Sequence, residues 1–190
     1  RIFINFLNGM NQDYSARGGS SSGGKKIEKI VINVGLGRAS SLPSFSDKFL
    51  PSVIEELSII TGQKPQTRPA KQSIAGFKLR AGTIIGLKVT LRKKRMRDFF
   101  QKLVNVVLPR VRDFRGIKYE AVDSSGNLTI GIKEYVVFPE VNTEIAKANF
   151  GLEVTIVPRE CNREKAIELY KSLGIPFSAQ GGSSSGGKNN

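Results

Sequence analysis

The 190-residue chain contains no histidine, no tryptophan and a single cysteine, Cys161. Without histidine it lacks the side chain that most often transfers protons at neutral pH, which is also the commonest protein ligand of metals. A Cys–His nucleophile is excluded for the same reason, and one cysteine cannot form an intramolecular disulfide. The composition therefore argues against an enzyme and against a bound metal or cofactor.

The carboxylates do not form a recognisable catalytic set either. Glu55 and Glu56 are adjacent in a predicted helix and Glu153 lies in a predicted strand, but no converging reactive group accompanies them. A structural or solvated role is the simpler interpretation. Long apolar runs are also missing, since none approaches the roughly 20 residues that cross a bilayer. No membrane partner is expected.

Acidic residues are scarce in one part of the chain. Lysine and arginine total 30 against 16 aspartates and glutamates, which gives a net charge of +14. The window 64–118 holds 16 of these cations and only two acids, Asp98 and Asp113, so it accounts for the whole excess. A concentrated field of one sign is costly unless a polyanion neutralises it. This segregation favours a nucleic-acid partner over a merely solubilising surface.

Two nearly identical Gly/Ser-rich tracts bracket the basic region. The eleven residues 15–25 recur at 178–188 with one difference. Such tracts have nothing to bury and are typical of flexible linkers. Both also resemble a phosphate-binding loop, but neither has the Ser or Thr that should follow the lysine. We expect three parts: an appended or replaced N-terminal segment with its linker (1–25), an RNA-binding domain (26–177) and a flexible tail (178–190).

The region between the tracts mixes strand and helix patterns. Runs rich in β-formers predict strands at 27–34, 84–91, 127–132 and 152–157. Helical spacing of apolar residues predicts helices at 51–60, 93–108 and 162–173. Gly62 suits the end of the first helix and Pro109 the end of the second. Because strands and helices are interspersed, we expect an α+β fold: an open, mostly antiparallel sheet with helices packed on one face.

Two basic clusters have the composition of RNA-binding loops. The segment 67–82 combines cations, glycines and Phe77, and is too broken for a helix and too polar for a core. Glycine lets the backbone approach a phosphate, cations neutralise it, and an aromatic ring stacks on a base or sugar. The alternative is that Ile74 and Phe77 turn inward and only anchor the loop. In 110–116 arginines alternate with apolar residues, and Asp113 is expected to orient one of them.

Six short motifs carry a resemblance to a known family. In order, they occupy residues 32–37, 61–65, 73–80, 86–92, 108–116 and 138–140. Over about 27–177 the chain resembles bacterial-type large-subunit ribosomal protein L5. The resemblance implies a domain that binds 5S rRNA in the central protuberance beside 23S-type rRNA, and that contacts the peptidyl-site tRNA and small-subunit protein S13. It also implies a ribosome of the cytoplasm or of an organelle matrix or stroma.

The resemblance can be carried onto matching positions. It implies 5S rRNA contacts at Asn33, Gln63, Lys64, Thr90, Arg92, Arg112 and Arg115. It implies a tRNA-facing loop that contains Lys71, Ser73, Gly76, Phe77, Lys78 and Arg80. Thr90 and Arg92 are expected to share one strand face, because residues i and i+2 of a strand point the same way. We expect the loop to be held only at its ends, which suits a ligand that comes and goes.

The N-terminal segment is not explained by the resemblance. Residues 1–25 do not match the N-terminal helix that the family usually has before its first strand. The alternative function is therefore an engineered scaffold of the same core, which displays residues 1–14 to a protein partner.

Deletion of residues 1–24 and 179–190 tests the expected division of the chain. If both ends are linkers with added segments, thermal unfolding of the shortened chain should match that of the full chain, because no buried surface is lost. A large drop in melting temperature would show instead that residues 1–14 pack on the core.

Overall fold

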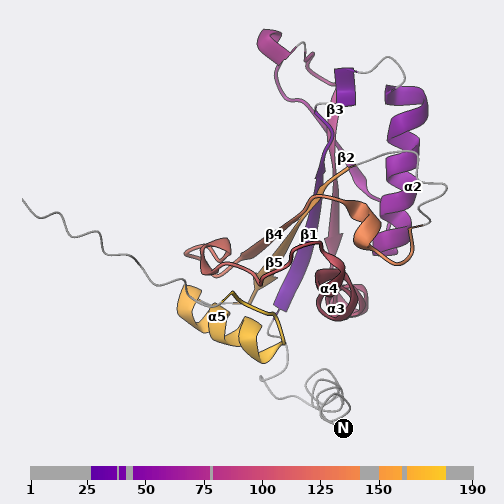
Figure 1. The fold of residues 1–190 in the computed structure, drawn as a ribbon. Coiled ribbons are helices and arrows are strands. Elements are labelled where there is room, and N and C mark those ends of the chain that lie inside the picture. The colour runs from indigo at the N-terminus through magenta and orange to yellow at the C-terminus, as the bar shows by residue number, and fades with distance from the viewer. Residues whose placement is uncertain are drawn as a thin grey trace, which may run out of the picture.

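A single five-stranded sheet organises the protein (Figure 1). The computed structural model describes residues 27–37, 39–41, 45–77, 79–141, 150–159 and 162–178. Its strands are β1 (Ile27–Gly35), β2 (Gln66–Pro69), β3 (Ile84–Leu91), β4 (Leu128–Ile132) and β5 (Leu152–Pro158). They are arranged in the order β2-β3-β1-β5-β4, and every neighbouring pair is antiparallel. The expected α+β fold with an open antiparallel sheet is confirmed.

The helices contribute the other half of the core. They are α2 (Leu50–Thr61), α3 (Lys93–Lys102), α4 (Leu108–Arg110) and α5 (Arg163–Ser172). Two π-helical turns adjoin them, η2 (Phe45–Phe49) and η4 (Leu103–Val107). Short 3₁₀ turns occupy η1 (Ala39–Ser41), η3 (Ala75–Phe77), η5 (Tyr119–Ala121) and η6 (Tyr135–Val137). Figure 1 shows α2 and α3 on the same side of the sheet.

Alternation along the strands divides the sheet into a covered and an open face. In β1, Ile30 and Ile32 are buried, whereas Val31 and Asn33 between and beyond them are half-buried. The strands β3, β4 and β5 repeat this alternation of buried and more exposed residues. Since successive side chains of a strand point to opposite faces, one face carries the apolar core and the other remains accessible.

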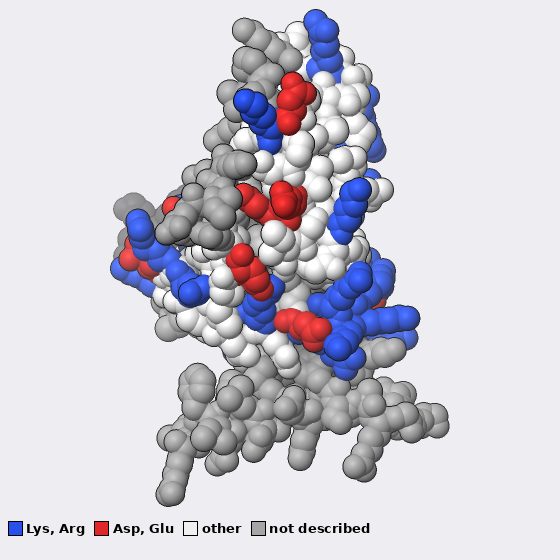
Figure 2. Space-filling view, turned by 90° about the vertical axis from the view of Figure 1, so that its right-hand side faces the viewer, with Lys and Arg blue, Asp and Glu red and all other residues white. Residues whose placement is uncertain are grey.

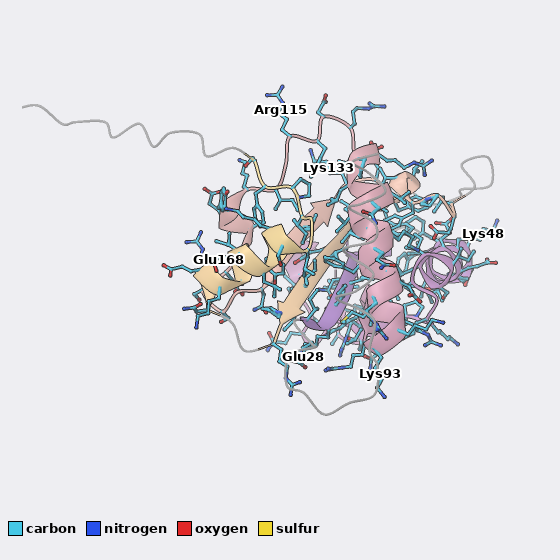
Figure 3. The ribbon with its side chains drawn as sticks, turned by 90° about the horizontal axis from the view of Figure 1, so that it is seen from below. Glu28, Lys48, Lys93, Arg115, Lys133 and Glu168 are labelled. Carbon is cyan, nitrogen blue, oxygen red and sulfur yellow. The ribbon has the colours of Figure 1, made fainter. Side chains whose placement is uncertain are left out.

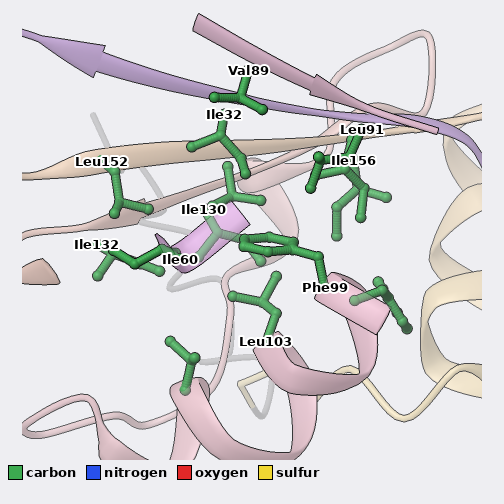
Figure 4. Packing of buried hydrophobic residues seen from close by; sticks show 14 of the residues in the cluster. Ile32, Ile60, Val89, Leu91, Phe99, Leu103, Ile130, Ile132, Leu152 and Ile156 are labelled. Carbon is green, nitrogen blue, oxygen red and sulfur yellow. The ribbon is translucent and has the colours of Figure 1, made fainter. Parts of the chain in front are cut away.

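The covered face packs tightly against the helices. Figure 4 shows Phe99 and Leu103 of the α3 region pointing into a cluster that includes Ile32, Ile130 and Ile156 from three strands. All five side chains are buried. Their removal from water is the main favourable contribution to folding, and it fixes which side of the sheet faces outward.

All seven predicted strands and helices are present, with ends that differ by at most two residues. Gly62 ends α2 in the left-handed conformation, with φ of 66°, and its N–H donates to the Ser58 carbonyl at 2.8 Å. The prediction that Pro109 ends the helix 93–108 is wrong, because helical structure continues from α3 through η4 and α4 to Arg110. In the widened turn η4 the Leu108 N–H donates to Leu103, five residues back. Pro109 therefore enters at the start of a new helical turn, where proline is tolerated.

The segment after α4 is tied to the C-terminal part of the domain. The Ile117 N–H donates to the Pro176 carbonyl at 2.8 Å, and the Ser178 N–H donates to the Ile117 carbonyl at 2.9 Å. Gly116 precedes this junction with φ of 98°. A Cβ there would lie 2.5 Å from the Ser178 nitrogen, so only glycine fits.

Replacing this glycine should therefore be unusually costly. Gly62→Ala meets no steric contact and should cost about 1–2 kcal/mol, the usual penalty for an L residue in the left-handed region. Gly116→Ala adds a backbone clash, which should raise the loss by a further ~1–3 kcal/mol. Urea unfolding of both variants measures the difference, and equal losses would contradict the close packing of this junction.

Candidate RNA-binding surface

The open face of the sheet carries a row of polar side chains across its central strands. Asn33 of β1 lies directly opposite Lys88 of β3 on one side and Glu153 of β5 on the other. Two residues earlier in β1, Val31 lies between Thr90 of β3 and Thr155 of β5. Hydrogen-bonded strands fix these spacings, so the row forms a preorganised surface of donors and acceptors.

The residue after β3 extends this face. Arg92 keeps an extended backbone, with φ of −139° and ψ of 164°, before α3 begins. Its side chain therefore continues the alternation and lies on the same face as Thr90, as predicted. Arg92 is exposed, which leaves its guanidinium able to reach a ligand laid on the sheet.

A glutamine joins the end of α2 to the same strand. Gln63 Nε2 donates to the Thr90 carbonyl at 3.3 Å, and Gln63 Oε1 accepts from Arg95 Nη1 at 3.4 Å. The exposed Lys64 follows directly. The structure thus brings together five predicted residues: Asn33, Gln63, Lys64, Thr90 and Arg92. Sequence reasoning did not assign Arg95 to this group, although it stands in a run of cations directly after Arg92.

A partner within the protein holds Arg92 in the free state. Its Nη1 atom donates to Glu28 Oε1 at 2.9 Å, and Lys29 Nζ lies 3.9 Å from the same oxygen. The hydrogen bond from Arg92, aided by the charge of Lys29, lowers the pKa of the Glu28 carboxyl below its ordinary value. Both side chains are about half exposed, so the pair is weak and a phosphate can compete for Arg92.

A run of four cations begins at Arg92 itself. Arg92, Lys93, Lys94 and Arg95 are consecutive and all exposed. Figure 3 places Glu28 and Lys93 at the same edge of the molecule. On the face shown in Figure 2, the largest group of Lys and Arg side chains lies at one lower corner, with acidic side chains beside it and at separate places over the rest of the face.

The second predicted basic cluster lies elsewhere. Arg112 and Arg115 are exposed on the segment that follows α4, and Figure 3 shows Arg115 at the opposite edge from Glu28 and Lys93. The structure does not bring these two arginines to the group around Thr90. Asp113 forms no ion pair with either of them in the described part of the chain, so its expected orienting contact is not found.

The segment predicted to face tRNA is a hairpin extension between β2 and β3. Ile74 and Leu79 exchange backbone hydrogen bonds of 2.9 and 3.2 Å, and the Ala81 N–H donates to Ser73 Oγ at 2.9 Å. These hydrogen bonds order the loop internally but do not tie it to another element, so the expectation that it is held only at its ends stays a prediction. Ile74 is 48% exposed, so it does not turn inward as the alternative required.

The other residues predicted in this loop are exposed wherever the structure describes them. Lys71, Ser73, Gly76 and Arg80 are exposed. Lys78 and the Phe77 side chain lie outside the described residues. Exposure of the described positions leaves the loop accessible to a large ligand.

The described part of the chain contains neither a candidate membrane span nor a candidate metal site. No helix there has the length and apolar character needed to cross a membrane. No group of three or more His, Cys, Asp or Glu residues there could hold a metal ion.

Comparison with known proteins matches the chain to one family, both by family models and by individual relatives. Residues 25–80 match the family of ribosomal protein L5, and residues 84–177 match the C-terminal region of the same ribosomal family. The chain is 52% identical over 152 residues to large ribosomal subunit protein uL5 of Oceanobacillus iheyensis. It is 51% identical to the same protein of Macrococcus caseolyticus and 49% identical to that of Syntrophomonas wolfei. Each alignment covers 80% of this chain and 83% of the relative.

The Arg92–Glu28 contact can be tested without any ligand. Arg92→Ala removes the largest cause of the lowered Glu28 pKa, so this pKa should rise towards the ordinary carboxyl value. Lys29→Ala, the matched control, should raise it less because its contribution is smaller. Titration of the Glu28 carboxyl followed by NMR measures both shifts, and an unchanged value in Arg92→Ala would rule out the contact in solution.

Proposed function

Because the chain belongs to the ribosomal protein L5 family of the large ribosomal subunit, we propose that its open sheet face binds 5S rRNA. The protein is a structural, non-enzymatic constituent of that subunit. The 5S rRNA is the partner that the family resemblance implies. The arrangement of the described residues supports the sheet face as the location of the contact.

The observation that carries this proposal is the alignment of polar groups on the rigid sheet. Lys88 of β3 lies directly opposite Asn33 of β1, and Thr90 follows two residues later on the same strand. The group is extended at one end by Gln63 and Arg92. Double-stranded RNA is recognised mostly by its shape, through contacts to 2′-hydroxyls and phosphates. A flat surface with fixed donors matches such a target better than a loop of the same composition.

Charge supports the same assignment. Lys64, Arg92 and the cations at 93–95 surround the polar group on the side of the β3–α3 junction. Phosphate contacts by Lys and Arg provide affinity, while fixed polar groups set the position of the RNA. In the complex a phosphate replaces Glu28 as the partner of Arg92, which exchanges one charge-assisted hydrogen bond for another.

The other partners belong to surfaces away from the sheet. The exposed hairpin at 71–80 is assigned to the peptidyl-site tRNA. The contacts with 23S-type rRNA and with protein S13 complete the proposal on the strength of the family resemblance. Arg112 and Arg115 lie apart from the sheet group, so a role in 5S rRNA binding requires a second contact area on that RNA.

Three single substitutions separate these surfaces. Arg92→Ala should weaken binding of purified 5S rRNA by about 1–3 kcal/mol if its contact is bidentate. Arg80→Ala should leave this affinity nearly unchanged and should instead weaken tRNA binding in assembled ribosomes. Arg115→Ala reports whether the segment after α4 reaches the same RNA. Filter binding at one fixed salt concentration measures all three.

The wild-type chain supplies the control. Its affinity should fall steeply with salt, with a log–log slope of roughly −0.7 to −0.9 per neutralised phosphate. If Arg80→Ala reduces 5S rRNA binding as much as Arg92→Ala does, the separation of two surfaces is wrong and the basic residues act as one patch.

A further inference from the structure

A shallow hollow on the open sheet face lies next to the polar row. It measures about 630 Å³ and is wide open to solvent. Among the residues that line it are Asn33, Gly35, Arg68, Gly131, Lys133 and Glu153. Strand register places Gly131, Glu153 and Asn33 side by side on β4, β5 and β1. The hollow is therefore continuous with the surface proposed for RNA.

The lining includes a carboxylate that a simple phosphate-binding surface would avoid. Glu153 is exposed, and it forms no ion pair within the described residues. A carboxylate repels phosphate, but it accepts hydrogen bonds from the amino and imino groups on the edges of nucleobases. Its position opposite Asn33, whose amide both donates and accepts, provides a pair of groups suited to reading a base edge.

The floor of the hollow is made of backbone where side chains would fit. A Cβ added to Gly35 or Gly131 would meet nothing within 4 Å, and neither residue has a left-handed backbone. Packing and conformation therefore give no reason for glycine at either strand position. Glycine weakens a strand and often marks a place where a ligand approaches closely. Here it leaves room for a flat ring to lie on the peptide groups.

Cations flank the hollow on both sides. Arg68 of β2 and Lys133 after β4 line its opposite ends and are exposed, and Lys88 stands on the far side of Asn33. This order of charges, positive at both ends and negative within, matches a nucleotide whose phosphates lie outside and whose base lies inside.

We propose that the hollow binds one nucleobase turned out of the bound RNA, with Asn33 and Glu153 reading its edge. The inference rests on the proposed binding of 5S rRNA and adds a specificity to it. A base whose edge carries an amino group, as those of guanine, cytosine and adenine do, donates to Glu153, whereas uracil presents carbonyl oxygens on either side of its single N–H. Arg68 and Lys133 hold the phosphates that flank this nucleotide.

Two substitutions and their controls test the site with purified 5S rRNA as the probe. Gly131→Val fills the floor and should lower affinity roughly tenfold, the loss of one good base contact, while leaving the melting temperature unchanged or higher. Ser172→Leu, which adds bulk at an exposed position of α5 outside the sheet, should have little effect. Glu153→Gln should weaken binding several-fold, whereas Glu164→Gln, a matched loss of charge on α5, should not.

The outcomes distinguish this site from the function on which it rests. If Glu153→Gln tightens binding, or if Gly131→Val binds like the wild type, the nucleobase site is overturned while RNA binding stands. If the wild-type chain does not bind 5S rRNA, the proposed function itself is overturned and the site with it. The Glu153→Gln result stays decisive even if Gly131→Val proves unstable.

Discussion

One-sided burial of the antiparallel sheet is the constraint on which the rest of the molecule depends. Ile30, Ile32 and Val34 of the central strand are buried against the helices, so Val31 and Asn33, which alternate with them, must face away. A shift of one residue in strand register would exchange the two faces and expose the core. The same packing that stabilises the fold therefore also positions every polar group of the open face.

The repulsion among the cations at the β3–α3 junction is a second constraint, and folding alone does not relieve it. The cations at the β3–α3 junction are consecutive and exposed, and Glu28 neutralises only part of their charge in the free protein. Neighbouring like charges repel one another, and binding of a polyanion relieves this repulsion. The Arg92–Glu28 pair keeps the guanidinium ordered near the sheet while remaining weak enough to exchange for a phosphate.

The sequence was informative where a pattern reports directly on burial. Strand bounds such as 84–91, the cap at Gly62 and the antiparallel α+β fold followed from apolar periodicity and turn chemistry. The short edge strand β2 was not predicted, because four exposed residues carry no alternation of burial. The sequence also could not reveal that Arg115 lies at the opposite edge of the molecule from Glu28 and Lys93, or that Gly35 and Gly131 border one hollow. These relations depend on the tertiary arrangement.

The central claim, that RNA lies on the open face of the sheet, is tested most directly by methyl NMR of the protein with and without 5S rRNA. Val31 and Val157 point to the open face, and Val89 and Val154 point into the core. We expect large shifts of the Val31 and Val157 methyl signals, with those of Val89 and Val154 nearly unchanged. Shifts confined to the segment that contains Arg112 and Arg115 would contradict it.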